Sequence, residues 1–174
     1  NGDPVAGGQG DLRALGEWVA ALDDSEQYAV AVSCVKDDTY AQEIGRTFKS
    51  LSSTTLHFVK SSATFAGVRN AYDEPQRLGV DRWLALLAIK ARGENSAVII
   101  DVGTACTIDV LENGQHLGGY IFPGMALARD ALVANTDKIR FSENPEPSTS
   151  LGTDTASCVL SGIWLTLLAS CQSV

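Results

Sequence analysis

Residues 97–122 read AVIIDVGTACTIDVLENGQHLGGYIF, and the fold is decided by this stretch. Its first four residues form a continuous apolar run that stops at Asp101, which is typical of a buried strand. Two further strand-like runs, Cys106–Leu111 and His116–Phe122, flank an Asn-Gly pair at 113–114. Asn-Gly between two such runs is the strongest short-range signal for a β-hairpin. The stretch therefore predicts one strand followed by an antiparallel hairpin.

The residues before this stretch predict alternating helices and strands. Apolar residues recur at helical spacing over 12–22, behind Asp11 as an N-cap, and again over 40–51. Short apolar or alternating runs at 28–35 and 54–59 predict strands. Strands that alternate with helices of this length indicate parallel β-α-β construction, so the fold class is α/β.

The other segments complete the predicted order of elements. Residues 61–78 are polar and predict an ordered loop with a short helix, whereas 81–92 predict a largely buried helix. A helix is expected at 124–134 behind Pro123, and a second one at 155–174.

Composition narrows the classes of function. The 174 residues are 45% hydrophobic and 20% charged, which is enough for a packed core. A net charge of -8 argues against binding to nucleic acid through bulk electrostatics.

We expect no membrane association, because no apolar run approaches ~18 residues and no signal peptide opens the chain. The four cysteines form no CxxC pair and are expected to be reduced thiols, and the two histidines are expected to be structural or solvent-facing.

The segment Gly79-Val80-Asp81-Arg82 precedes the buried helix and has two interpretations. Asp81 is a good N-cap for that helix. The same position favours an ionised carboxylate, which suits a general base that takes a proton from a substrate hydroxyl. Arg82 adds a planar fork of donors that matches a carboxylate or a phosphate. The residues alone leave both interpretations open.

The segment Asp101-Val102-Gly103-Thr104 also has two interpretations. Gly103 would let a phosphate approach the backbone, Thr104 offers a hydroxyl and an N–H, and Asp101 can face a cation. An ordinary turn between strands, without a ligand, explains the pattern as well.

Two other features are ambiguous when taken alone. The pair Gly118-Gly119 inside a strand implies close approach of a backbone or a ligand, and tight packing of a helix on the sheet accounts for it equally. Tyr72 lies in a polar loop, either as a surface aromatic or as a ring that lines a substrate site.

Four segments, in this order and spacing, resemble the type III pantothenate kinase family, which has the actin-like ATPase, sugar kinase and Hsp70 fold. They are AGVRNAY (66–72), LGVDRWLAL (78–86), VIIDVGTACTIDV (98–110) and LGGYIFPGMAL (117–127), and GTDTASCVLSG (152–162) matches more loosely. The resemblance implies ATP-dependent phosphorylation of pantothenate, the first step of coenzyme A synthesis, in the cytoplasm.

The resemblance also implies roles for single residues. Asp81 would be the catalytic base, and the pantothenate site would comprise Tyr72, Gly79, Val80, Asp81, Arg82 and Thr155. Gly103 and Thr104 would contact ATP, which is used with Mg²⁺, and Asp101 would hold a monovalent cation, K⁺ or NH₄⁺. Family members are homodimers with the active site at the subunit interface, so a homodimer is expected.

One family motif is missing. The first phosphate loop of the family, D-x-G-N-[ST]-x-x-[KR], has no match in Asn1–Gly10. We therefore expect a chain truncated at both ends, without part of its N-terminal strands, and inactive by itself. Residues 1–78 are expected to be the remainder of the N-terminal subdomain, and 79–174 an incomplete C-terminal subdomain.

Two other functions compete with the kinase. A regulatory or accessory member of the same family would not need Asp81, Arg82, Asp101 and Thr104 together. An actin-like ATPase would need a residue that positions water instead of an acceptor pocket. The presence of all four residues favours the enzyme.

Overall fold

A computed structural model of the chain describes residues 11–22, 29–49 and 55–174. Residues 1–10, where the first phosphate loop has no match, lie outside the described part. The chain divides into two compact units, one made of 1–61 with 79–81 and the other of 62–78 with 82–174. Each unit has its own hydrophobic core.

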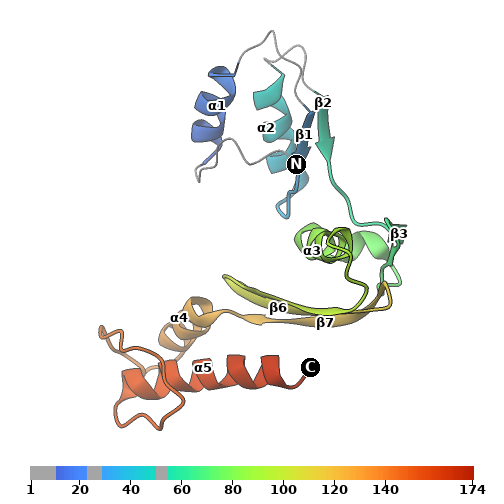
Figure 1. The fold of residues 1–174 in the computed structure, drawn as a ribbon. Helices are drawn as coiled ribbons and strands as arrows, with labels where there is room; N and C mark the ends of the chain where they lie inside the picture. The colour runs from blue at the N-terminus through green and yellow to red at the C-terminus, as the bar shows by residue number, and fades with distance from the viewer. Residues whose placement is uncertain (1–10, 23–28, 50–54) are drawn as a thin grey trace. The chain divides into compact units, whose positions relative to one another are not determined.

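The first unit is a parallel β-α-β arrangement. Its elements are α1 (Leu12–Ala20), β1 (Ala29–Val32), α2 (Asp38–Phe48) and β2 (Thr55–Phe58), and β1 pairs in parallel with β2. Both helices lie on the same side of the two strands (Figure 1). Their N-caps are Asp11 and Asp37, whose carboxylates accept hydrogen bonds from backbone N–H groups one turn on. The predicted helices, strands and N-cap Asp11 are confirmed for this unit.

The second unit contains a five-stranded mixed sheet with the order β3-β4-β7-β6-β5. Its elements are β3 (Thr64–Phe65), β4 (Val68–Arg69), the 3₁₀ turn η1 (Pro75–Arg77), α3 (Val80–Ala91), β5 (Ala97–Val102), β6 (Ala105–Glu112), β7 (Gln115–Pro123), α4 (Met125–Asn135) and α5 (Thr155–Gln172). The first two residues of α3 are grouped with the first unit.

The hairpin between β6 and β7 forms as predicted. Asn113 and Gly114 have φ angles of 51° and 77°, the left-handed values of a two-residue hairpin turn. Register then places Asp109 opposite Gly119 and Leu111 opposite His116.

The prediction for residues 61–78 is incomplete. In addition to the turn η1, the segment contains the antiparallel strands β3 and β4. Ala66 and Gly67 form the tight turn between them, with φ angles of 49° and 81°. Strands of two residues are too short to show an alternating pattern in the sequence.

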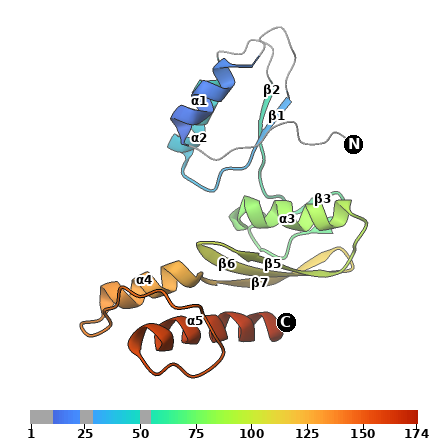
Figure 2. The ribbon, with the colours of Figure 1, turned by 60° about the vertical axis from the view of Figure 1, so that its left-hand side comes forward.

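Helix α3 covers one face of this sheet, and α5 lies on the other side (Figure 2). The core beneath α3 is formed by Val68, Leu78, Trp83, Leu86 and Leu111. Side chains alternate between the two faces of a strand, so Asp109 and Leu111 of β6 share the face below α3. Ile108 of β6, also buried, lies on the opposite face.

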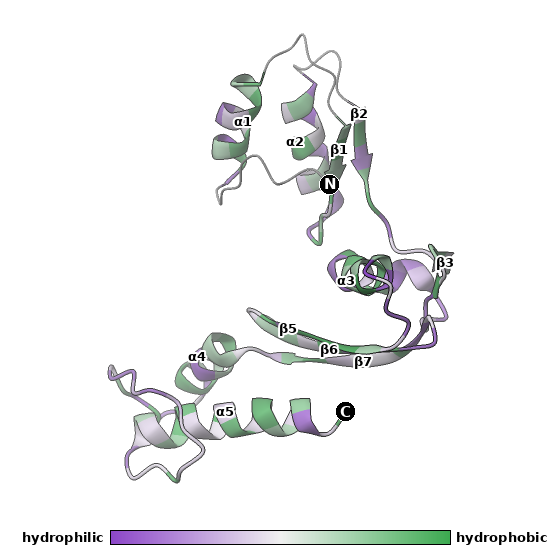
Figure 3. Ribbon diagram, in the orientation of Figure 1, coloured by the Kyte–Doolittle hydropathy of each residue, from purple (hydrophilic) through white to green (hydrophobic). Residues whose placement is uncertain are grey.

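Helix α5 corrects the prediction that no segment is long and apolar enough to span a membrane. It has 18 residues and a mean hydropathy of 1.3, and it is the one described helix that meets these criteria. Figure 3 shows it green to pale over most of its length, with purple near its C-terminal end. Length and composition are shared with the core helices of soluble proteins, and α5 buries Ala156, Leu160 and Leu167.

Candidate functional site

A buried ion pair joins helix α3 to the sheet. Arg82 is 6% exposed and Asp109 is 2% exposed. Nε of Arg82 donates to Oδ2 of Asp109 at 2.7 Å, and Nη2 donates to Oδ1 at 2.6 Å. The pair is therefore bidentate, the geometry in which a guanidinium and a carboxylate best satisfy each other away from water.

His116 is the second partner of Asp109. Its ring is fully buried, and its Nε2 lies 2.8 Å from Oδ1 of Asp109. The backbone N–H of Ala71 points at its Nδ1, 3.4 Å away, so Nδ1 acts as an acceptor. Nε2 then carries the hydrogen and donates it to Asp109, which assigns a neutral imidazole. The sequence predicted that His116 is either structural or solvent-facing. The structural alternative is confirmed, because the side chain is buried.

Tyr72 adds an aromatic ring and a hydroxyl to this group. The Tyr72 hydroxyl accepts a hydrogen bond of 3.1 Å from Nη1 of Arg82. Its ring stacks on His116, with 6.4 Å between ring centroids and 14° between the planes. Tyr72, Arg82, Asp109 and His116 thus form a closed set of contacts, which we call the buried polar cluster.

Gly119 makes room for the cluster. A Cβ at this position would lie 2.1 Å from the carbonyl oxygen of Ile108, 2.7 Å from Oδ1 of Asp109 and 2.8 Å from Nη2 of Arg82. The close approach predicted from the glycine pair is confirmed for Gly119, where groups of the protein itself come close. A Cβ on Gly118 would meet no atom within 4 Å. A side chain at 119 would therefore force the backbone at Ile108 and the side chains of the ion pair to shift.

The charges of the ion pair hold each other in the ionised state. Burial alone favours the neutral carboxyl of Asp109, but hydrogen bonds from His116 and Arg82 outweigh burial and keep its pKa below the ordinary value. Burial likewise opposes the charge on Arg82, and its bonds to Asp109 and Tyr72 nevertheless raise its pKa. Both groups are charged at neutral pH.

Asp81 lies in the first turn of α3, one residue before Arg82. The helix begins at Val80, so Asp81 is inside the first turn and is not the N-cap of our first interpretation. Its side chain is exposed, in contrast to the buried Arg82. The segment therefore offers a carboxylate to solvent directly beside a side chain that is fixed in the interior.

In the segment Asp101–Thr104, Asp101 and Val102 are the last residues of β5, and Gly103 and Thr104 form the turn to β6. The N–H of Gly103 donates to the carbonyl of Ala105 at 3.1 Å, and the N–H of Gly124 donates to the carbonyl of Thr104 at 2.9 Å. A Cβ on Gly124 would lie 2.0 Å from the carbonyl oxygen of Gly103, so the start of α4 fits against this turn because residue 124 is glycine. Asp101, Gly103 and Thr104 remain exposed.

Two further predicted site residues, Thr155 and the cation ligand Asp101, lie outside the buried polar cluster. Thr155 is the first residue of α5, behind the N-cap Asp154, and its side chain is exposed. Among the described residues, no group of three His, Cys, Asp or Glu side chains gathers around a metal position. Asp101, the predicted cation ligand, is exposed at the end of β5, and its role stays a prediction.

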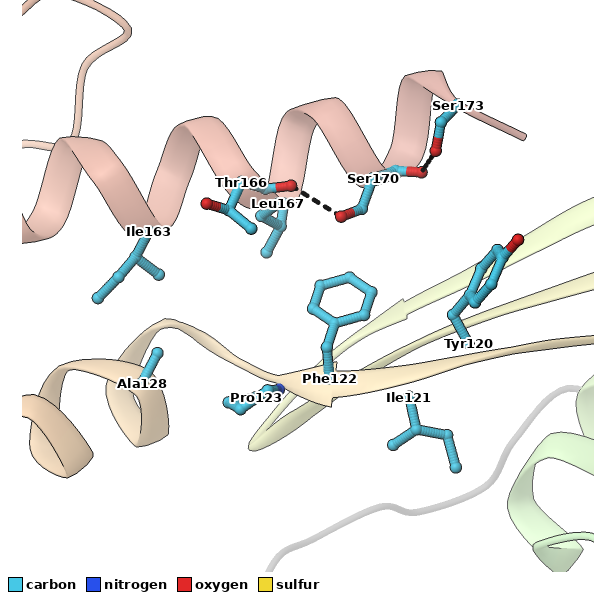
Figure 4. A pocket seen from close by; sticks show the side chains of 10 residues that line it. All are labelled: Tyr120, Ile121, Phe122, Pro123, Ala128, Ile163, Thr166, Leu167, Ser170 and Ser173. Atoms are coloured by element: carbon cyan, nitrogen blue, oxygen red, sulfur yellow. Dashed lines mark hydrogen bonds between the residues drawn. The ribbon is translucent and has the colours of Figure 1, made fainter.

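A pocket of about 500 Å³ lies between β7 and α5, away from the predicted site residues. Figure 4 shows Phe122 and Tyr120 on the side of α5 and Ile121 pointing away from it. Thr166 and Ser170 also line this space, and their hydroxyls donate to backbone carbonyls of α5 itself. The pocket is largely apolar and carries no ionisable pair among its described lining residues.

The structure brings together two of the predicted substrate residues, Tyr72 and Arg82. It also shows two cluster members that the sequence analysis did not assign, Asp109 and His116. One signal for Asp109 was available: a charged residue inside an apolar strand, which the hairpin register places opposite Gly119. No comparable signal exists for His116, because it is bonded to a loop 45 residues away.

Comparisons with known proteins agree with one another on the family. The family model for type III pantothenate kinase matches residues 8–174. A type III pantothenate kinase of Acinetobacter baumannii is 38% identical over 147 residues, which is 84% of this chain and 59% of the relative. One from a Marinomonas species is 47% identical over 85 residues, 48% of this chain and 35% of the relative. The chain thus spans somewhat more than half the length of the Acinetobacter relative.

A solved structure resembles the fold. A Baf family protein from Campylobacter jejuni superimposes with a TM-score of 0.55 at 19% identity, covering 90% of this chain and 68% of that one. The predicted α/β fold is confirmed.

Proposed function

We propose, because this chain belongs to the type III pantothenate kinase family, that the protein phosphorylates pantothenate with ATP. The observation that supports this proposal most strongly is the start of α3. An exposed carboxylate, Asp81, lies beside Arg82, whose side chain is fixed by a buried bidentate pair. The first turn of α3 gives Asp81 a defined backbone position next to an ordered Arg82, and catalysis of proton transfer requires a positioned base.

Asp81 would take the proton of the primary hydroxyl of pantothenate as the oxygen attacks the γ-phosphate of ATP. Gly79, Val80 and Arg82 would surround the acceptor, with Tyr72 at 3.1 Å from Arg82 as a further wall. Thr155, exposed at the N-terminus of α5, would contribute a hydroxyl to the same substrate.

The turn between β5 and β6 would serve the nucleotide. Gly103 lacks a side chain and Thr104 is exposed, so both suit an approaching phosphate. Asp101 would hold a monovalent cation, K⁺ or NH₄⁺, and Mg²⁺ bound with ATP would supply charge neutralisation at the phosphates. Comparison of rates in potassium and sodium buffers tests the monovalent cation.

We also expect a cytoplasmic homodimer with the active site at the subunit interface. In the second unit Val102, Tyr120 and Leu165 are each more than half exposed, at 59%, 63% and 53%. Large apolar side chains exposed to solvent support a surface that binds a second copy of the chain. Sedimentation equilibrium tests it, since a monomer at micromolar concentration would contradict the homodimer.

Replacement of Asp81 by Asn tests the kinase function in the full-length protein. We expect pantothenate phosphorylation to fall by about 10²–10⁴-fold, the usual contribution of a general base, while ATP binding changes little. Asp38→Asn is the matched control, because Asp38 is also an exposed aspartate in the first turn of a helix. Both variants lose the same interaction with the helix dipole, and only Asp81→Asn should lose activity.

Three results would contradict the proposal in different ways. A wild-type protein that leaves pantothenate unphosphorylated would exclude the activity itself. An Asp81→Asn variant with near-normal rates would place the base elsewhere. ATP hydrolysis that is independent of pantothenate would favour the ATPase, and calorimetry without heat at millimolar pantothenate would favour the regulatory member.

A further inference from the structure

We propose that Asp109 and His116 are positioning residues that aim the hydroxyl of Tyr72 at an oxygen atom of the acceptor substrate, whose identity rests on the proposed function. Asp109 touches Arg82, and His116 touches both Asp109 and Tyr72. Both side chains are buried, so they act on the substrate only through Arg82 and Tyr72.

The hydrogen bond between Arg82 and Tyr72 has one possible direction. A guanidinium has five N–H donors and no acceptor, so Nη1 of Arg82 must be the donor and the Tyr72 oxygen the acceptor. The O–H of Tyr72 is then directed away from Arg82. A phenol held in this way presents a donor to an oxygen of a ligand, and a misplaced Arg82 would let the hydroxyl rotate.

Asp109 fixes the side chain of Arg82. An arginine side chain has four rotatable bonds and loses its freedom only where its fork is held. Asp109 holds Nε and Nη2 at 2.7 Å and 2.6 Å, which leaves Nη1 on the side of Tyr72. Asp109 therefore determines the position of Nη1 of Arg82, which donates to the Tyr72 hydroxyl.

His116 connects Asp109 to the segment that carries Tyr72. Its Nε2–H donates to Oδ1 of Asp109, and its Nδ1 accepts the N–H of Ala71, the residue before Tyr72. Its ring also stacks on Tyr72. His116 thus holds both ends of the cluster, the carboxylate and the tyrosine, through opposite edges of one imidazole.

The charges of the cluster agree with a positioning role. Arg82 carries one positive charge, Asp109 one negative charge, and the imidazole is neutral, so the cluster has no net charge. A cluster without net charge does not attract anionic ligands through its overall charge. The contribution of Asp109 and His116 to binding is the placement of Arg82 and the direction of the Tyr72 O–H.

A double-mutant cycle in the full-length protein tests the role of Asp109. We expect Asp109→Asn to raise the KM for pantothenate by about 10–100-fold, the loss of one hydrogen bond to a charged group, with the KM for ATP within about 3-fold of wild type. In the Tyr72→Phe background, which has no hydroxyl to aim, Asp109→Asn should raise the pantothenate KM by a smaller factor than in wild type, because coupled sites are not additive. The effect that remains is the part that acts through Arg82 itself. Asp130→Asn is the control, since it removes an exposed carboxylate bonded to Arg129 at 2.7 Å and should leave both KM values unchanged.

His116 is tested by a conservative and a disruptive change. The amide of His116→Gln still offers one donor and one acceptor and should keep the pantothenate KM within about 3-fold of wild type. His116→Phe preserves the ring stack but removes both hydrogen bonds, and it should resemble Asp109→Asn. A purely structural role would instead lower activity without this separation of the two KM values.

The tautomer of His116 gives a readout that does not depend on activity. The chain has two histidines, His57 and His116, so ¹⁵N spectra of their ring nitrogens can be assigned with a His57→Gln variant. We expect the Nε2–H tautomer for His116 at pH 7.5, and the Nδ1–H tautomer would overturn the positioning role.

Failure of the positioning role and failure of the proposed function give different results. Additive effects of Asp109→Asn and Tyr72→Phe in an active protein would overturn the positioning role alone. A wild-type protein that does not phosphorylate pantothenate would overturn the proposed function, and the positioning role with it.

Discussion

Asp109 is a carboxylate removed from water and compensated by two side chains, and this arrangement makes stability depend on pH. Folding lowers its pKa below the ordinary value of about 3.9. The unfolded chain therefore takes up a proton at this position before the folded protein does. The stabilisation is complete above that ordinary value and is lost as the pH falls through the pKa of the folded state.

Asp109→Asn should therefore both lower the free energy of unfolding and weaken its pH dependence. At pH 7 we expect a loss of about 3–5 kcal/mol, because Arg82 is left buried without its partner charge. Between about pH 5 and pH 2 the urea-unfolding curve of the variant should decline less than that of wild type. Asp154, whose pKa is also lowered by hydrogen bonds from Ser157, is present in both proteins, so the difference between the curves belongs to Asp109.

The exposed pair Arg129–Asp130 is the reference for this measurement. Asp130→Asn removes the same charge at 62% exposure and should change the free energy of unfolding by no more than about 0.5 kcal/mol. Equal losses for the two variants, or parallel pH curves for wild type and Asp109→Asn, would show that the buried pair does not carry this stability.

At the scale of elements, the absence of a side chain at Gly119 allows α3 to pack closely on the sheet. We expect Gly119→Ala to destabilise the protein by about 2–5 kcal/mol, because its Cβ would overlap backbone and break the ion pair. Gly162→Ala is the matched control in α5, where a Cβ meets no atom within 4 Å. That change should stabilise by about 0.5–1 kcal/mol, since alanine favours helix.

Denaturant unfolding of the two alanine variants measures both effects. Opposite signs support the role of Gly119 as the space for Arg82. A Gly119→Ala variant as stable as wild type would mean that β7 can shift away from α3 without cost.

Elements whose signals are local could be predicted, and those that depend on distant contacts could not. The Asn-Gly turn, the cap Asp11 and the apolar periodicity of α3 all lie within one or two turns of chain, and each predicted the correct element. The two-residue strands β3 and β4 exist because β4 pairs with β7, at Arg69 and Gln115, and no local pattern shows that pairing.

The residues of the candidate site also fall into two groups, those predicted from local motifs and those that only distant contacts bring together. Asp81, Arg82 and Tyr72 were found from short motifs and a family resemblance. The contact of Arg82 with Asp109 spans 27 residues, and that of His116 with Ala71 spans 45. A sequence shows which residues can form ion pairs, but only the folded sheet determines which of them are buried together.

At the scale of the whole molecule, two separate cores imply two separately responding units. The first core contains Val19, Ile44 and Phe48, and the second contains Trp83 and Leu86 among others. Local unfolding follows the core that is weakened, because opening free energies are set by buried contacts.

Hydrogen exchange measured by mass spectrometry can therefore locate the boundary between the units. We expect Phe48→Ala, which costs about 3–5 kcal/mol, to speed exchange in α1 and α2 while α3 and the hairpin stay protected. Leu86→Ala should have the opposite pattern. Acceleration of both units by either change would show a single cooperative core.

Residues 62–78 are the informative segment in this experiment, because the sequence predicts that they belong to the N-terminal subdomain. Val68 and Leu78 pack in the core beneath α3, so we expect the segment to respond to Leu86→Ala. Tyr72 lies in the same segment and would lose protection together with Arg82, as the buried polar cluster requires. A response to Phe48→Ala instead would support the boundary at residue 78, and it would detach Tyr72 from the part of the chain that holds its hydroxyl.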